Sequence, residues 1–379
     1  MNVGQHYDCA VIGGGLAGLS LSIQLAREGF KVVLFEKESY PFHKVCGEYV
    51  SMESFGFLED LGCPLHDWQL PVMNRLMVST SSGNSLISKL PLGGFGLSRY
   101  RLDAVLAEVA KQSGVIVLEQ VKVSGVTYDD SLFYVGTANG IFKAPVCCGA
   151  FGKRSNLDVR WNREFTRRKN NELNNFIGVK YHALLDHPRD MIALHHFHNG
   201  YCGISAIEEN KYCICYLTIA ENLRQNRNDI RLMEHNILYK NHYLKRLLSS
   251  ARHLYKVPLT ISQISFDKKQ QIENHVLMTG DAAGMITPLC GNGMCMALHG
   301  SKIAAKLVSD FLYRKISRST MERQYEEQWQ RTFHRRLCNG RVIQRLFAHE
   351  MLLDIFINAI RPFPVLVGQI VQRTHGRIF

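Results

Sequence analysis

The fold of this chain is decided near its start by the stretch DCAVIGGGLAGLSLS, residues 8–22. The apolar run Cys9–Ile12 predicts a strand buried on both faces, and residues 16–28 place apolar side chains at helical spacing. Gly29 is typical of a residue that ends a helix, and residues 31–35 (KVVLF) predict a second buried strand. A strand, a glycine-rich turn, a helix and a strand in this order predict two parallel strands joined by a crossover helix.

The glycines of this turn indicate a dinucleotide site. Gly13, Gly15 and Gly18 fit the pattern GxGxxG. The first glycine permits a tight turn, the second lets a diphosphate approach the backbone, and the third lets helix and strand pack closely. Glu36 ends the second strand, where a carboxylate accepts hydrogen bonds from both ribose hydroxyls and repels a 2′-phosphate. The ligand is therefore an unphosphorylated ADP-ribosyl group, which leaves FAD and NAD open.

A second glycine-rich segment far downstream favours FAD. The apolar residues 275–279 predict a strand, and the segments GDAAG (280–284) and PLCGNGM (288–294) follow and open a helix. We expect Asp281 to bind a ribityl hydroxyl, and the amides of residues 291–294 to face the flavin, where negative charge appears on reduction. A nicotinamide dehydrogenase has no use for this element.

On these residues the chain resembles the FAD-dependent oxidoreductases that include geranylgeranyl reductases and p-hydroxybenzoate hydroxylase-like monooxygenases. Four segments carry the resemblance: GGGLAG with Glu36, YPFHKVCGEYVS (40–51), LSRYRLDAVL (97–106) and TGDAAGMITPLCGNGM (279–294). The resemblance implies that Arg99 reaches the FAD phosphates, with Asp103 in the same short pattern. The predicted cofactor-binding residues are Gly13, Gly14, Gly15, Leu16, Ala17, Gly18, Glu36, Lys37, Cys46, Gly47, Arg99, Gly280, Asp281, Pro288, Gly291, Asn292, Gly293 and Met294.

The loop 40–51 provides the candidate catalytic residues. Its Cys46-Gly47 pair resembles the loop of geranylgeranyl reductases that passes close to the isoalloxazine ring. In that interpretation Cys46 tunes or protects the flavin and Glu48 moves a proton. In the alternative, Gly47 makes a turn and Cys46 fills a gap. Both interpretations stay open.

One segment departs from the family pattern. Monooxygenases of this kind carry an Asp-Gly pair after a strand, and here Phe151 replaces the aspartate. In the family this pair helps to bind NAD(P)H, so the change puts that role in doubt. NADH or NADPH remains a candidate electron donor, and Lys153 and Arg154 are the side chains that would attract it.

The composition sets limits on partners and compartment. The chain has 379 residues, 46% of them hydrophobic, and a net charge of +12. Its basic stretches do not interleave aromatics with Lys and Arg, so we expect no nucleic acid. The eleven cysteines form no CxxC pair, and we expect reduced thiols in a cytoplasmic protein.

The histidines of residues 195–198 do not predict a metal site. Strand alternation would place His196 and His198 on one face, but no third ligand matches them. A sheet-surface or substrate-facing role is favoured, and we expect no metal.

The expected fold class is α/β. It combines a Rossmann-like FAD domain of the glutathione-reductase type, an inserted antiparallel substrate sheet and a helical C-terminal region. Residues 1–72, 98–160 and 270–316 are assigned to the FAD domain, residues 73–97 and 161–269 to the substrate domain, and residues 317–379 to the C-terminal region. Four alternating segments between residues 175 and 219 predict strands, residues 227–250 predict a helix, and Pro362 and Pro364 break the C-terminal helices.

The C-terminal region, residues 317–379, is rich in both basic and apolar residues, and two positions are open to its helices. Its apolar side can pack on the flavin domain, which is the commoner arrangement, or it can make peripheral contact with an anionic membrane.

The predicted function is FAD-dependent redox chemistry on a lipophilic small molecule. Reduction of a carbon–carbon double bond, as in geranylgeranyl reductases, is favoured by the Cys46-Gly47 loop. Hydroxylation of an aromatic or polyketide ring is the alternative, because residues 292–294 (NGM) are close to the GlnGlyMet of hydroxylases. A flavin electron carrier without a substrate is the third interpretation.

Overall fold

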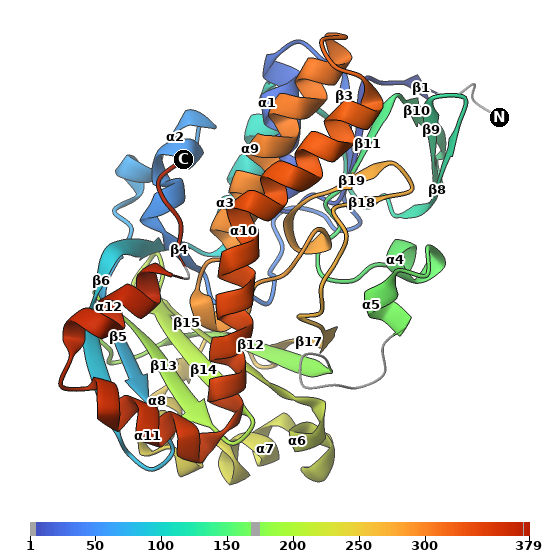
Figure 1. Ribbon diagram of the computed structural model, residues 1–379. Helices are drawn as coiled ribbons and strands as arrows, with labels where there is room; N and C mark the ends of the chain where they lie inside the picture. The colour runs from blue at the N-terminus through green and yellow to red at the C-terminus, as the bar shows by residue number, and fades with distance from the viewer. Residues whose placement is uncertain (1–4, 168–174, 374) are drawn as a thin grey trace.

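The computed structural model describes residues 5–167, 175–373 and 375–379. Residues 1–4 and 168–174, which the sequence assigns to the FAD and substrate domains, lie outside the described residues. The described chain forms two sheet-containing halves, and the long helix α10 (Arg318–Ala348) runs from one to the other (Figure 1).

A six-stranded sheet forms the core of the first half. Its strands lie in the order β18-β19-β11-β2-β3-β7, and all neighbours are parallel except β18 and β19. The strand bounds are β18 Ile272–Glu273, β19 Val276–Met278, β11 Val146–Gly149, β2 Cys9–Ile12, β3 Val32–Phe35 and β7 Ile116–Leu118. The predicted unit of parallel strands is thus confirmed as β2, α1 (Leu16–Arg27) and β3.

Helices and a small sheet cover this core. Helix α1 packs against α3 (Arg99–Gln112) and α9 (Gly293–Leu312), and α10 packs on α9. A separate four-stranded sheet has the order β1-β10-β9-β8. Its bounds are β1 Gln5–His6, β10 Gly140–Ala144, β9 Leu132–Thr137 and β8 Val123–Asp129, and short helices α4 (Asn156–Arg160) and α5 (Glu164–Arg167) follow it in the chain.

A nine-stranded sheet forms the second half. Its order is β16-β12-β15-β14-β13-β5-β6-β4, with β17 pairing β12. The bounds are β4 Tyr49–Ser51, β5 Val72–Ser79, β6 Ser85–Gly96, β12 Phe176–Leu184, β13 Met191–Phe197, β14 Gly200–Ala206, β15 Tyr212–Ile219, β16 Arg252–His253 and β17 Leu259–Ile264. The four strands predicted between residues 175 and 219 are confirmed, and β5 and β6 join their sheet as expected. The domain boundaries drawn from the sequence stay a prediction.

One face of this sheet carries its own helical cover. Alternate residues of β14, such as Cys202 and Ile204, pack with Met233, Leu244 and Leu247 of the helices. Those helices are α6 (Ala220–Gln225), α7 (Ile230–Asn236) and α8 (His242–Ser250). The opposite residues of each strand are therefore left to face the first half and the C-terminal helices.

The helix predicted over residues 227–250 is wrong as a single element. The Asn241 side chain accepts hydrogen bonds from the amides of Tyr243 and Leu244, so a new helix begins at His242.

The C-terminal region is helical, as predicted. Helices α11 (Glu350–Ile360) and α12 (Pro364–Gln372) follow α10, with an additional break at His349 that the sequence did not indicate. Short helix α2 (Phe55–Asp60) completes the set of α-helices in the described residues. Within those residues, every helix is too short or too polar to cross a bilayer. The predicted α/β class with a helical C-terminal part is confirmed, but the second sheet is mixed and not purely antiparallel, because β5 and β13 pair in parallel.

Candidate functional site

A cavity of about 1150 Å³ opens between the two sheets. The predicted cofactor-binding residues line it, with the exception of Gly14 and Gly18. Segments from four separate parts of the chain meet there: the β2–α1 turn, the loop before β4, the start of α3 and the segment between β19 and α9. The fold therefore brings the separated motifs to one place.

The glycines of the first turn are required by close packing. Gly13 has φ +107°, and a Cβ there would stand 2.5 Å from the carbonyl oxygen of Ala150. A Cβ on Gly18 would stand 2.0 Å from the carbonyl oxygen of Gly13, so any larger residue forces helix α1 away from the turn. Gly18 therefore acts by letting the helix approach, as the motif predicts, and not by lining the cavity.

Glu36 anchors the turn from the end of β3. Its Oε2 accepts a hydrogen bond of 2.9 Å from the Gly14 amide, and its Oε1 accepts one of 3.1 Å from the Glu38 amide. The side chain is buried and lines the cavity. A carboxylate oxygen accepts more than one hydrogen bond, so Glu36 keeps acceptor capacity for a ligand. Lys37, by contrast, points toward solvent at the cavity edge and lies 3.7 Å from Glu38.

Cations gather beside the glycine turn. The Arg99 guanidinium donates hydrogen bonds of 2.7 and 2.8 Å to both oxygens of Asp103, and Lys44 Nζ lies 3.0 Å from the same carboxylate. A Cβ on Gly15 would stand 3.7 Å from Arg99 and from Lys44. Burial would raise the pKa of Asp103, but the charges of Arg99 and Lys44 lower it, so the carboxylate stays ionised and orients both cations.

Lys44 is a cavity residue that the sequence analysis missed. It stands inside the loop 40–51, two residues before Cys46, and a lysine in that loop was the available signal. Its position favours binding of an anionic group at the turn.

The segment between β19 and α9 forms the cavity wall opposite the β2–α1 turn. Gly280 and Asp281 lie in the short helix η4 (Gly280–Ala282), and Pro288 begins η5 (Pro288–Cys290). Gly291 has φ +65°, and α9 begins at Gly293. The amino terminus of α9 thus faces the cavity, where a helix dipole stabilises negative charge.

A buried lysine joins this wall to the β11 turn. Lys269 Nζ donates hydrogen bonds of 2.7 Å to the carbonyl of Lys153 and 2.8 Å to that of Asp281. Burial lowers the pKa of Lys269 to about 8. No motif marks Lys269, so the sequence offered no signal for it.

Glu48 sits in a buried, fully paired network. It has φ +57° and is 0% exposed. Its Oε1 accepts hydrogen bonds from Lys180 Nζ (2.5 Å) and the Arg99 amide (2.8 Å), and its Oε2 lies 2.6 Å from His182 Nε2. Burial would raise the pKa of Glu48, but Lys180 and His182 lower it to about 2. A carboxyl group held ionised is a poor proton donor, which argues against the proton-moving role considered for Glu48.

The network extends toward the surface. His182 Nδ1 lies 2.6 Å from the Tyr255 hydroxyl, which lies 3.0 Å from His43 Nε2. His43 lines the cavity and stacks on the exposed Tyr100. Burial and the charge of Lys180 lower the pKa of His43 to about 4, so its ring is neutral near pH 7.

The same network fixes the loop that carries Cys46. Lys180 donates to the Lys44 carbonyl (3.0 Å), the Ser205 hydroxyl to the Gly47 carbonyl (2.6 Å), and the Cys213 thiol to the Cys46 carbonyl (3.2 Å). Three strands of the large sheet thus hold the loop against the cavity. Cys46 is half-buried, and burial raises the pKa of its thiol, which keeps it protonated at neutral pH.

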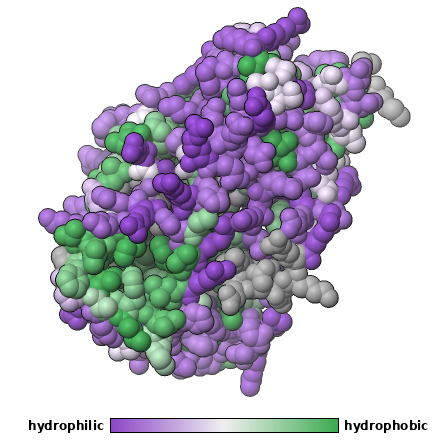
Figure 2. Space-filling model, viewed as in Figure 1, coloured by the Kyte–Doolittle hydropathy of each residue, from purple (hydrophilic) through white to green (hydrophobic). Residues whose placement is uncertain are grey.

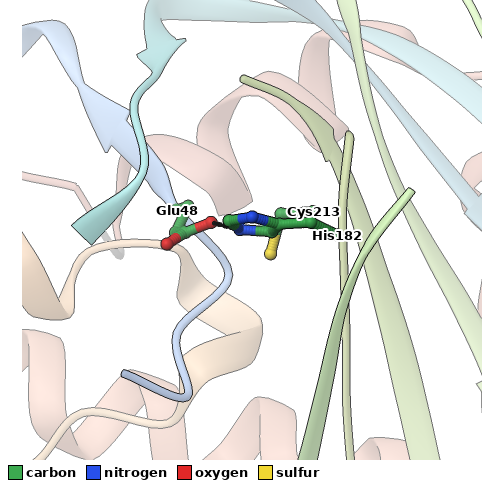
Figure 3. Close-up of side chains that lie close together, drawn as sticks. All are labelled: Glu48, His182 and Cys213. Atoms are coloured by element: carbon green, nitrogen blue, oxygen red, sulfur yellow. Dashed lines mark hydrogen bonds and ion pairs between the residues drawn. The ribbon is translucent and has the colours of Figure 1, made fainter. Parts of the chain in front are cut away.

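One group in the described residues has metal-ligand side chains within reach of one another: Glu48, His182 and Cys213. Figure 3 shows the His182 ring pointing at the Glu48 carboxylate, with Cys213 beside it on the paired strand. The Lys180 ammonium already neutralises this carboxylate, and its positive charge opposes a divalent cation there. Glu48 is therefore the anion of a buried ion pair with Lys180, and the Cys213 thiol donates a hydrogen bond to the Cys46 carbonyl.

The histidines of β13 do not form a shared face. His195 Nδ1 lies 2.7 Å from the Ser79 hydroxyl, and His196 is buried near Phe347. His198 directly follows β13, which ends at Phe197, so the expected placement of His196 and His198 on one strand face stays a prediction.

The large sheet supplies an apolar wall. The strand residues that alternate with those facing α6–α8 point into the cavity, together with Met285. They include Ile192, Leu194, Tyr201, Gly203, Leu217 and Ile261. This half of the cavity suits a hydrocarbon-like ligand. Phe151 also lines the cavity, next to the β2–α1 turn.

The residues present fit FAD. The cavity connects the glycine turn with the amino terminus of α9, and each end carries groups that complement a different part of FAD. Arg99 and Lys44 suit a diphosphate, Glu36 suits a ribose, and the α9 terminus suits the flavin ring.

Comparison with known proteins gives the same result. The family model described as "FAD binding domain" matches residues 6–328. Conditioned medium factor receptor 1 of Dictyostelium discoideum is 28% identical over 361 residues, which cover 86% of this chain and 68% of that protein. Digeranylgeranylglycerophospholipid reductase 2 of Methanothermobacter thermautotrophicus is 24% identical over 363 residues, covering 92% of this chain and 88% of that protein.

Solved structures share the fold. A geranylgeranyl bacteriochlorophyll reductase-like protein from Thermoplasma acidophilum has a TM-score of 0.80 at 18% identity, covering 98% of this chain and 96% of its own. The flavin-dependent brominase Bmp2 also has a TM-score of 0.80, at 17% identity, covering 99% of this chain and 94% of its own. A reductase-like protein and a flavin-dependent brominase therefore share this fold, and the fold alone does not choose a reaction for this chain.

Proposed function

This chain belongs to the FAD binding domain family and is an FAD-dependent enzyme; on that premise we propose that it reduces a carbon–carbon double bond in a lipophilic, isoprenoid-like molecule. The observation that carries the proposal is the apolar sheet wall formed by Leu194, Tyr201 and Leu217 across the cavity from the cofactor motifs. The similarity to a digeranylgeranylglycerophospholipid reductase supports it. A flavin electron carrier would not need this wall.

Residues from both halves would hold the cofactor. Gly13 and Gly15 admit the diphosphate, Arg99 and Lys44 neutralise it, and Glu36 accepts from the ribose. Asp281 and the α9 terminus would hold the ribityl chain and the ring. Once bound and reduced by an electron donor, FAD would supply the electron pair that the reduction of a double bond consumes.

The protein's own residues position the substrate and exclude water. The sheet wall aligns an apolar chain beside the loop of Cys46, and the buried Glu48–Lys180 pair keeps that loop in place. Reduction also consumes two protons, which would come from solvent. We propose that Cys46 contacts the flavin as a neutral thiol, and that Glu48 positions the loop in place of donating a proton.

The electron donor is proposed to be NADH or NADPH. Lys153 and Arg154 line the cavity next to Phe151, where they would attract the donor's phosphates. An oxidation assay with each nicotinamide, using the FAD-loaded protein, tests this directly.

Hydroxylation of an aromatic ring is the second candidate. The residues Asn292 to Met294 at the start of α9, which resemble the hydroxylase pattern, favour it. The two reactions leave different products, because reduction adds two hydrogen atoms and hydroxylation adds one oxygen atom.

The test uses the FAD-loaded protein with a geranylgeranyl lipid, first anaerobically after dithionite reduction and then under ¹⁸O₂. We expect a product that has gained two hydrogen atoms per reduced bond and carries no ¹⁸O by mass spectrometry. Incorporation of ¹⁸O into an aromatic substrate, with no hydrogenation of the lipid, would overturn the proposal.

A cavity-filling variant links the reaction to the sheet wall. Gly203 lines the cavity, and a Cβ there would meet only ordinary contacts, the nearest 3.6 Å away. Gly203→Leu should therefore retain FAD but lose turnover about tenfold or more, because the side chain occupies substrate space. Gly136→Leu is the matched control, since Gly136 lies in β9, away from the cavity, with its nearest contact at 3.5 Å.

A further inference from the structure

Helices α11 and α12 expose a continuous apolar surface, which we call the α11–α12 face. Figure 2 shows a broad group of hydrophobic side chains over these helices at the lower left of the molecule, whereas the rest of that view is mostly polar with smaller hydrophobic spots. Met351 is 75% exposed and Val365 is 72% exposed. The residues of the face are Met351, Leu352, Ile355, Phe363, Val365 and Leu366. Exposed apolar patches of this kind mark sites for a partner or a membrane.

The face belongs to firmly packed helices. Leu353, Ile357 and Val367, on the inner side of the same two helices, are buried in one apolar cluster. In addition, Asp354 accepts hydrogen bonds from the hydroxyls of Thr80 and Ser82, which tie α11 to the turn between β5 and β6. The exposed side chains are thus presented outward by a fixed scaffold.

The inner side of these helices reaches the cavity. The cluster that contains Leu353 and Ile357 also contains Tyr201, Leu217 and Met285, which line the apolar half of the cavity. One apolar cluster therefore connects the inner side of these helices with the cavity lining.

The charges around the face favour an anionic surface. Arg361 is exposed between α11 and α12, and Arg373 is exposed at the end of α12. The acidic side chains of α11 do not oppose them, because Asp354 is engaged inward and Glu350 is only half-exposed in the first turn. Aliphatic and aromatic side chains flanked by arginines are the combination that settles into the interface of an anionic bilayer.

We propose that the α11–α12 face seats the protein on an anionic lipid bilayer, with its apolar side chains in the interface and Arg361 at the lipid phosphates. That this binding serves to capture a lipophilic substrate from the membrane rests on the proposed function. Membrane binding itself is independent of the proposed function.

The test is co-sedimentation of the FAD-loaded full chain with vesicles. We expect binding to vesicles of phosphatidylglycerol and phosphatidylcholine, weaker binding to phosphatidylcholine alone, and a decline with added salt. The double variant Met351→Ser/Ile355→Ser should weaken binding about tenfold or more, and Arg361→Glu should selectively reduce binding to the anionic vesicles.

A matched control separates this face from general surface hydrophobicity. Val257 is 74% exposed but lies between β16 and β17, outside the face, so Val257→Ser should bind vesicles like the unaltered chain. The flavin absorbance and circular dichroism of each variant report whether it is folded.

Three results would overturn the proposal. One is equal binding of the double variant and the unaltered chain, and another is no binding of the unaltered chain to either vesicle. The third is sedimentation velocity showing a dimer that the double variant dissociates, which would assign the face to a second copy. Turnover of detergent-dispersed lipid is measured separately, so loss of that activity with vesicle binding intact would contradict only the proposed function.

Discussion

At the residue scale, Glu48 is the most constrained polar side chain of the site. A buried carboxylate is stable only when cations and donors surround it, and Lys180 and His182 supply them from strand β12. Its backbone stands at φ +57°, a conformation that few non-glycine residues adopt. The loop of Cys46 is therefore held by a charge pair that itself depends on the large sheet.

Removal of the lysine from this pair should destabilise the protein strongly. Lys180→Met leaves the Glu48 carboxylate buried without its cation, and we expect a loss of about 3–5 kcal/mol in the free energy of unfolding. Denaturant unfolding at fixed FAD concentration measures it. Lys306→Met is the control, because Lys306 pairs with Asp310 on an exposed helix surface and should change stability by less than about 0.5 kcal/mol.

The Glu48–Lys180 pair also predicts that the free energy of unfolding depends on pH. The folded pKa of Glu48, about 2, lies below its ordinary value of 4.5. The stabilisation is therefore fully present above pH 4.5 and is lost as the pH falls toward 2. We expect Glu48→Gln to be less stable than the unaltered chain at neutral pH. Between pH 4.5 and 2 the variant should lose less stability than the unaltered chain. Parallel curves of unfolding free energy against pH for the two proteins would contradict the assignment.

At the scale of elements, the β2–α1–β3 unit depends on the close contact of helix α1 with the preceding turn at Gly18. Gly18→Ala places a Cβ 2.0 Å from the Gly13 carbonyl oxygen. We expect a loss of about 1–3 kcal/mol in stability and an FAD affinity about tenfold or more lower, followed by flavin fluorescence. Gly56→Ala in helix α2 is the control, because a Cβ there meets nothing within 4 Å, and it should leave FAD affinity unchanged.

The sequence was sufficient for this unit because its signals are local. Apolar runs, helical spacing and three glycines lie within one short segment and are enough to predict strand, turn and helix. The break at Asn241 was missed because a capping side chain interrupts a pattern that otherwise continues to Ser250. The partners Lys180, His182 and Lys269 were missed for another reason: they meet the site only through strand pairing and loop packing, which residue spacing does not encode.

At the scale of the whole molecule, residues from both halves line the cavity. The six-stranded half supplies the charged and glycine-rich end, and the nine-stranded half supplies the apolar end. The sequence predicted the cofactor motifs and the four strands of the second sheet between residues 175 and 219. It did not predict which strand face points at the cofactor, because both faces of β14 and β15 are buried and their apolar runs look alike.

FAD binding in this cavity is tested most directly by titrating the purified, cofactor-stripped full chain with FAD, followed by calorimetry and absorbance. We expect saturation at one FAD per chain, with weaker binding for Glu36→Ala because the ribose loses its acceptor. A chain that stays colourless and shows no saturable heat, although circular dichroism shows it folded, would exclude FAD from the cavity.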